Sequence, residues 1–272
     1  AKLWAILEGH DQGVSDVAFS GDGKYIASSG GDRVARLYDL QTKQQLRTFE
    51  GHGGAVKSLH FSPDGGYLVT ASEDATLKLW DVETGREVRS FEGHGANIDR
   101  VRFSRDGRIL LSEAADGTAR LWDAPTGQFV RLLSNRDGEI ASLDISADGL
   151  LGVTTRGDMS WHVFEIATGE DTLVLRGQRG NGSAVAFAPD GRSVYSGARD
   201  GSVRRWDLLS GQELQRFIES GPTVTGLVLD PSGRRMVTST EDRKVLVWDL
   251  LKPPARHKTD VRSKFPDTEK EA

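Results

Sequence analysis

The sequence contains no cysteine in its 272 residues. This absence excludes a disulfide framework, a thiolate metal site and a cysteine nucleophile. It also agrees with a reducing compartment, so we expect a cytoplasmic protein. The sequence lacks any run of the roughly eighteen apolar residues that a membrane-spanning helix needs, and it opens without a charged-then-apolar leader. We therefore expect no membrane partner and no signal peptide in this chain.

A strong excess of charge of one sign is also lacking. The 35 basic and 40 acidic side chains leave a net charge of −5, and the basic residues form no stripe. Because nucleic-acid binding needs a basic footprint, we expect no nucleic acid as partner. Glycine, in contrast, is in excess: the 32 glycines are about 12% of the chain, against roughly 7% in an average protein. They follow no three-residue period, which excludes collagen, so we expect them in turns.

An internal repeat organises the whole chain. An aromatic residue followed by an acid recurs every 42 residues without an insertion, at Tyr38-Asp39, Trp80-Asp81, Trp122-Asp123, Phe164-Glu165, Trp206-Asp207 and Trp248-Asp249. Six residues before each aromatic stands an aspartate: Asp32, Asp74, Asp116, Asp158, Asp200 and Asp242. Four residues before each aspartate stands a hydroxyl: Ser28, Thr70, Ser112, Thr154, Ser196 and Thr238. The first three units also have a Gly-His pair, ending at His10, His52 and His94.

Each unit carries the signals of four short antiparallel strands. In the second unit, apolar residues within 56–61 precede the turn at Asp64-Gly65, and the run 67–70 follows it. An alternating run at 76–80, a turn and a last strand complete the unit. Asp-Gly and Thr-Gly between β-branched and aromatic runs are hairpin signals. Four such strands per 42 residues predict an all-β fold of β-propeller blades. The residues expected at the hairpin tips are Gly23, Gly65, Gly107, Gly149, Gly191 and Gly233.

These columns resemble the WD40 family, whose units combine Gly-His, Ser/Thr, Asp and Trp-Asp within ~40–45 residues. The resemblance covers Lys2 to about Leu250. It implies that each blade holds a buried, hydrogen-bonded tetrad of these side chains. The complete tetrads are His52, Thr70, Asp74 and Trp80, and His94, Ser112, Asp116 and Trp122. Elsewhere Tyr38 replaces Trp in unit one, Gln178 replaces His in unit five, and Arg136 and Phe164 leave unit four with half the set.

The units are cyclically offset, because residues 2–10 align with 44–52, the last strand of a unit. We expect this N-terminal strand to pair with the last blade and close a six-bladed WD40-type propeller over residues 1–250. A cut-down larger propeller is the alternative. Residues 251–272 are polar and contain Pro253, Pro254 and Pro266, so we expect a tail or linker there. Its modest basic stretch is more typical of a solvated linker than of a binding site: Lys252, Arg256, Lys258, Arg262 and Lys264.

No motif predicts catalysis. The sequence has no P-loop, no nucleophile elbow and no zinc-binding helix motif. His60, His162 and His257 share no column, so we expect no metal and no cofactor. The tetrad Asp and His residues recur once per blade instead of converging, so we interpret them as structural. The competing hypothesis is an enzyme or small-ligand site at the channel mouth. Its candidate groups are Asp16, Lys57, Asp99 and Glu139.

Variable residues at the ends of a propeller's channel are where binding tends to reside. One ring follows the Gly-His column: Gly13, Ala55, Asn97, Glu139, Asn181 and Thr223, with Ser15, Lys57, Asp99, Ala141, Ser183 and Thr225 two residues on. A second ring precedes each repeated aspartate: Gly31, Glu73, Ala115, Gly157, Arg199 and Glu241. The expected partner-binding face comprises Asp16, Lys57, Glu73, Asn97, Asp99, Arg100, Glu139, Arg199 and Glu241.

The leading hypothesis for function is a non-catalytic module that binds another protein or a peptide, as the resemblance implies. We expect a monomeric propeller that acts as a scaffold or adaptor within a larger signalling or regulatory protein. A purely structural part of an assembly is a third possibility.

Unit four departs most from the pattern. Trp161 stands in a column otherwise filled by Ala35, Leu77, Ala119, Val203 and Val245. We expect Trp161 to fill space left by the lost tetrad tryptophan rather than to act as a binding anchor. We also expect this blade to be the least stable.

Overall fold

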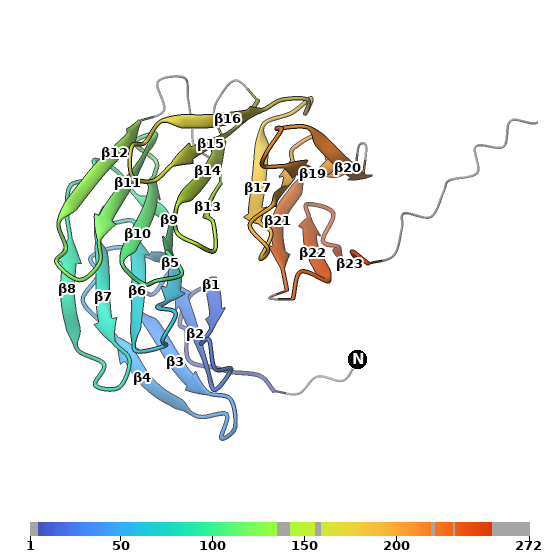
Figure 1. Ribbon diagram of the computed structural model, residues 1–272. Helices are drawn as coiled ribbons and strands as arrows, with labels where there is room; N and C mark the ends of the chain where they lie inside the picture. The colour runs from blue at the N-terminus through green and yellow to red at the C-terminus, as the bar shows by residue number, and fades with distance from the viewer. Residues whose placement is uncertain (1–4, 135–141, 156–158, 219–220, 231, 252–272) are drawn as a thin grey trace, which may run out of the picture.

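The computed structural model describes residues 5–134, 142–155, 159–218, 221–230 and 232–251. Within these ranges the chain forms 23 strands in six antiparallel sheets. The sheets follow one another as blades along an arc (Figure 1). No helix that could cross a membrane occurs in the described ranges. The predicted all-β, six-bladed propeller is therefore confirmed, while the expected tail lies outside the described residues except for Leu251.

Five blades have four strands and the sixth has three. Blade one consists of β1 (Val14–Phe19), β2 (Tyr25–Gly30), β3 (Ala35–Asp39) and β4 (Gln45–Phe49). Blade two consists of β5 (Val56–Phe61), β6 (Tyr67–Ser72), β7 (Leu77–Asp81) and β8 (Glu87–Phe91). Blade three consists of β9 (Ile98–Phe103), β10 (Ile109–Ala114), β11 (Thr118–Asp123) and β12 (Phe129–Ser134). Blade four consists of β13 (Leu143–Ile145), β14 (Leu151–Thr155), β15 (Trp161–Glu165) and β16 (Asp171–Leu175). Blade five consists of β17 (Gly182–Phe187), β18 (Ser193–Ala198), β19 (Val203–Asp207) and β20 (Glu213–Ile218). Blade six consists of β21 (Val224–Leu229), β22 (Arg235–Thr240) and β23 (Val245–Asp249).

The hairpin between the first two strands of a blade is built by a short polar turn. In blade two, Ser62 Oγ donates a hydrogen bond to Asp64 Oδ1 at 2.5 Å, and the Gly66 N–H donates to the same oxygen at 3.0 Å. Gly65 adopts a φ of +74°, a conformation that glycine reaches without a steric cost. The equivalent Gly23, Gly107, Gly149, Gly191 and Gly233 also have positive φ. The prediction that these glycines close the hairpins is confirmed.

The hydrophobic core lies in layers between neighbouring blades. Leu77 of β7 and Ile98 of β9 are fully buried in one cluster that joins blades two and three. The first strand of each blade contacts the first strand of the next, as in β1 with β5 and β17 with β21. This packing places β1, β5, β9, β13, β17 and β21 along the inside of the arc, where they line the central channel.

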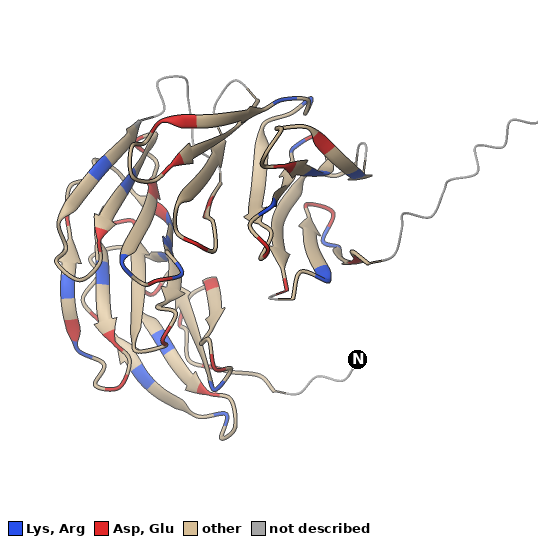
Figure 2. Cartoon of the chain, viewed as in Figure 1, with Lys and Arg blue, Asp and Glu red and all other residues tan. Residues whose placement is uncertain are grey.

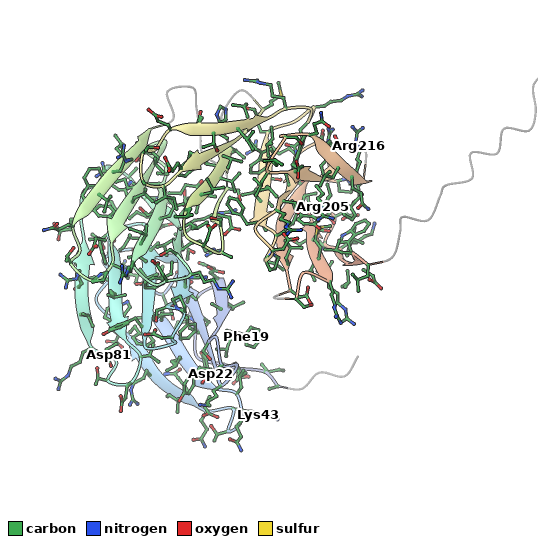
Figure 3. All side chains as sticks on the ribbon, viewed as in Figure 1. Phe19, Asp22, Lys43, Asp81, Arg205 and Arg216 are labelled. Carbon is green, nitrogen blue, oxygen red and sulfur yellow. The ribbon has the colours of Figure 1, made fainter. Side chains whose placement is uncertain are left out.

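The two end blades expose positions that are buried in blade two. Val14 and Val245 are 57% and 66% exposed, whereas the equivalent Val56 and Leu77 are fully buried. Phe19 lies on the side of blade one that faces the opening of the arc (Figure 3). Residues 5–10 form no strand beside β23. Closure by the N-terminal strand therefore stays a prediction, and these apolar flanks are the surfaces that closure would cover.

Candidate interaction face at the channel mouth

A buried chain of hydrogen bonds anchors the loops of blade two. Trp80 Nε1 donates to Thr70 Oγ1 at 2.8 Å, and that hydroxyl lies 2.7 Å from His52 Nε2. His52 Nδ1 lies 2.8 Å from Asp74 Oδ2. These contacts are satisfied together when Thr70 donates to Nε2 and the Nδ1–H of a neutral His52 donates to Asp74. Blade three repeats the chain, with 2.8, 2.7 and 3.2 Å between Trp122, Ser112, His94 and Asp116.

The charges of this tetrad follow from burial and hydrogen bonding. Burial lowers the pKa of His52 below its usual value, which keeps the imidazole neutral near pH 7. Burial alone would raise the pKa of Asp74. Hydrogen bonds from Thr76, His52 and the Gly53 N–H outweigh that effect and lower the pKa of Asp74 to about 2. Asp74 is therefore an ionised acceptor with its oxygens already engaged, an arrangement suited to holding loops together.

The other blades keep parts of this arrangement. In blade one, His10 contacts Asp32 at 2.8 Å and Ser28 at 2.7 Å, while the hydroxyl of Tyr38 donates to the Glu8 carbonyl instead. In blade five, Gln178 Nε2 donates to Ser196 Oγ at 2.7 Å and takes the place of histidine. In blade four, Arg136 and Asp158 lie outside the described residues.

Trp161 is fully buried, but in a different space from the one predicted. Phe164 packs against blade three, whereas Trp161 packs on the opposite side, against blade five. Its Nε1 donates to Gln178 Oε1 at 2.5 Å, and a Cβ atom on Gly182 would collide with its indole. Trp161 thus fills the room that Gly182 leaves, and the prediction that it replaces the lost tetrad tryptophan was wrong. Its burial also excludes a role as a surface anchor.

The two variable rings lie next to each other at one end of the blades. Asp74 accepts a hydrogen bond from the Gly53 N–H at 2.8 Å, which ties the loop before β5 to the turn after β6. The Glu73 N–H then donates to the Ala55 carbonyl at 2.9 Å. The equivalent bonds join Gly31 to Gly13, Ala115 to Asn97, Arg199 to Asn181 and Glu241 to Thr223. In these blades, the backbone bond between the two rings therefore lies directly beside the aspartate of the tetrad column.

The structure places the expected face residues around the mouth of the channel. Glu73, Asn97, Asp99, Arg199 and Glu241 are exposed, Asp16, Lys57 and Arg100 are half-buried, and Glu139 lies outside the described residues. Lys57 Nζ is 3.5 Å from Glu73 Oε1, which joins the two rings in blade two. Arg100 donates to Ser142 Oγ in the next blade at 3.0 Å. Basic and acidic residues are interspersed along the ribbon of the blades (Figure 2). The face itself combines acidic, basic and amide residues, so it is polar and of mixed charge.

A cavity of about 870 Å³ extends from this mouth between the six inner strands. The sequence analysis did not assign three ionisable lining residues to the site: His60, Arg102 and Asp144. They occupy one column, 42 residues apart, on β5, β9 and β13. The 42-residue spacing of these three residues is visible in the sequence, but they have only polarity in common and differ in residue type. A comparison of the histidine positions alone therefore does not reveal the column.

Two of these residues satisfy backbone groups of a neighbouring blade. His60 Nδ1 accepts a hydrogen bond from the Phe103 N–H at 3.2 Å, and Asp144 Oδ2 accepts one from the Phe187 N–H at 2.7 Å. Burial lowers the pKa of His60 to about 3 and raises the pKa of Asp144 to about 6. His60 therefore stays neutral near pH 7 and acts as an acceptor for the next inner strand.

Three of the four groups of the competing enzyme hypothesis, Asp16, Lys57 and Asp99, line the same cavity, and Glu139 lies outside the described residues. Asp16 and Lys57 are already engaged by neighbouring groups. Asp16 accepts hydrogen bonds from Ser58 Oγ at 3.0 Å and from the Leu59 N–H at 3.2 Å. Lys57 is paired with Glu73. In the described part of the chain, no group of three or more His, Asp or Glu side chains is arranged to hold a metal ion.

A comparison with protein families agrees with this architecture. The family model described as "WD domain, G-beta repeat" matches residues 1–39, 43–81, 85–123, 169–207 and 211–249. The stretch between the third and fourth matches contains β13, β14 and β15, the first three strands of blade four. This blade is also the one whose tetrad columns are most altered.

Proposed function

Since its five matches cover well over half of the chain, the protein belongs to the WD40 family, and we propose that its channel-mouth face binds a protein or peptide partner. WD40 propellers generally serve as non-catalytic interaction modules. The observation that carries the proposal is the repeated backbone link between the two variable rings. Because the scaffold holds these loops rigidly while their side chains vary, the face can be specific without losing stability.

The side chains at the mouth suit a polar partner surface. Exposed acids, amides and an arginine surround a cavity whose volume of about 870 Å³ can admit side chains of a bound segment. Interfaces of this kind combine a few buried anchors with a polar rim. The cavity provides the place for the anchors, and the two rings provide the rim.

We propose further that the protein acts without catalysis, as a monomeric scaffold or adaptor. Its setting would be a larger signalling or regulatory protein of the cytoplasm. The engagement of Asp16 and Lys57 in structural contacts supports the non-catalytic role. The lack of cysteine agrees with a reducing compartment.

The proposal can be tested with peptides selected from a displayed random library on the intact chain. The face variant replaces four exposed residues by alanine: Glu73, Asn97, Arg199 and Glu241. The matched control replaces four exposed residues at the opposite end of the blades, with the same charges: Gln41, Glu83, Glu170 and Arg192. We expect the selected peptides to bind the face variant at least tenfold more weakly and the control variant unchanged. Equal binding to the face variant and to the unmodified protein would contradict the proposal.

A further inference from the structure

Two arginines on one strand point into the channel. Arg100 and Arg102 of β9 both line the cavity, and as residues two apart they share one face of the strand. Their positions are separated by roughly 7 Å along β9, at about 3.4 Å per residue. Both are half-buried, so their guanidinium groups are partly withdrawn from water while remaining reachable from the channel.

Neither arginine forms an ion pair with a carboxylate in the described part of the chain. Arg100 Nη1 donates to Ser142 Oγ at 3.0 Å, and Arg102 Nη1 donates to the carbonyl of its neighbour Val101 at 3.0 Å. Each guanidinium has five N–H donors, so most of their donor capacity is left over. The half-buried setting strengthens any charge-assisted bond that these donors make.

The acidic groups of the cavity are already engaged by the scaffold. Asp16 accepts from Ser58 Oγ and the Leu59 N–H. Asp144 accepts from the Phe187 N–H at 2.7 Å. Glu73 at the mouth is paired with Lys57, and both residues belong to the interaction face. Asp99, which also lines the cavity, has an interaction of its own, and the positive charge of Arg102 offsets part of the rise in the pKa of Asp144. Among the described charged groups of the channel wall, Arg100 and Arg102 therefore keep the largest unused donor capacity.

The far wall of the channel is uncharged. The positions that correspond to Arg100 and Arg102 are Ala184 and Ala186 in β17 and Gly226 and Val228 in β21. All four residues line the same cavity. The β9 side of the channel thus offers charged donors, whereas the side formed by β17 and β21 offers small uncharged residues. The volume of about 870 Å³ falls within the roughly 300–1,000 Å³ of typical ligand pockets.

We propose that Arg100 and Arg102 bind an oxyanion, a carboxylate or a phosphate, carried by the side chain of a partner peptide that enters the channel. The inference rests on the proposed interaction at the channel mouth and names the chemistry of its central anchor. Guanidinium groups bind carboxylates and phosphates with paired hydrogen bonds, and the neutral wall formed by β17 and β21 accommodates the rest of the peptide.

The experiment compares three pools of fluorescein-labelled nonapeptides that are random except for the central residue. That residue is glutamate, phosphoserine or glutamine, and binding to the intact chain is followed by fluorescence anisotropy. We expect the glutamate or the phosphoserine pool to bind at least tenfold more tightly than the glutamine pool. The double variant Arg100→Gln/Arg102→Gln should lose this preference. The control Arg105→Gln/Arg108→Gln, in the exposed hairpin at the other end of β9, should keep it.

The outcomes separate this inference from the proposed function. Peptide binding that depends on the face variant but shows no acidic preference would overturn the anion anchor and leave the interaction face standing. If inorganic phosphate alone binds as tightly as the peptides, the site serves a free anion and the peptide assignment is wrong. Should the glutamine variant unfold, Arg100→Lys/Arg102→Lys retains both charges, and it must keep a reduced acidic preference for the inference to hold.

Discussion

Replacing Thr70 by valine removes the central hydroxyl of the blade-two tetrad with little change in shape. Thr70 and Trp80 are 1% and 2% exposed, so water cannot replace the lost partner. The substitution leaves the Nε1–H of Trp80 and the Nε2 of His52 without the bonds of 2.8 and 2.7 Å that they make to Thr70. A buried polar group without a partner costs about 1–3 kcal/mol. Two such groups should lower the free energy of unfolding by about 2–6 kcal/mol.

The matched control is Thr84→Val in the turn between β7 and β8. The hydroxyl of Thr84 likewise forms a side-chain hydrogen bond, to the carboxylate of Asp81 at 2.7 Å, but it is exposed to water. Its loss should cost no more than about 1 kcal/mol. Urea unfolding at pH 7.5 measures both variants, and hydrogen exchange in β6 and β7 locates the effect if the blades unfold separately. Equal losses from the two substitutions would refute the role assigned to the tetrad.

Three further predictions follow from the same contacts. Trp161→Leu should lower the free energy of unfolding by about 2–4 kcal/mol, and Gly182→Ile should lower it as well. In a urea double-mutant cycle, the double variant should lose less stability than the sum of the two single losses. Strict additivity would argue against the pairing of Trp161 with Gly182. Acidification should lower the urea midpoint in two stages. Below about pH 6.5, the lowered pKa values of His52 and His60 make the unfolded chain bind protons first, an effect larger than the opposing one of Asp144, whose pKa of about 6 favours the native state. From about pH 4 to 2 the midpoint falls again, as Asp74 with its pKa of about 2 is protonated. A midpoint that stays constant from pH 8 to 2 would contradict this assignment. Blade four should exchange its strand amides faster than blades two and three, and equal protection would show that its altered tetrad carries no cost.

The repeat made most of the fold predictable. A hydroxyl, an aspartate and an aromatic at constant spacing define where each blade begins and ends, because the tetrad can form only at that spacing. Hairpin tips were predictable for a local reason, since the Asp-Gly turn needs the positive φ that Gly65 shows. Closure of the ring depends on contacts between the two ends of the chain, which no local pattern specifies.

The candidate site was less predictable than the fold. The position of the rings followed from the repeat, but the inward direction of His60, Arg102 and Asp144 emerges only when the inner strands stand side by side. The contact between Trp161 and Gly182 could not be predicted for a similar reason. Gly182 belongs to the next unit, and the exchange of a large for a small side chain across a blade boundary leaves no mark within one repeat.

The most direct test of the account is a hydrogen-exchange footprint of the intact chain with and without a bound peptide selected as described. Protection by the peptide is predicted in residues 53–57, 97–102 and 241–244, which surround the mouth and wall of the channel. The turn at residues 83–86, at the opposite end of blade two, should exchange at the same rate in both states. Protection confined to such turns, with no change around the channel, would contradict the assignment of the interaction face.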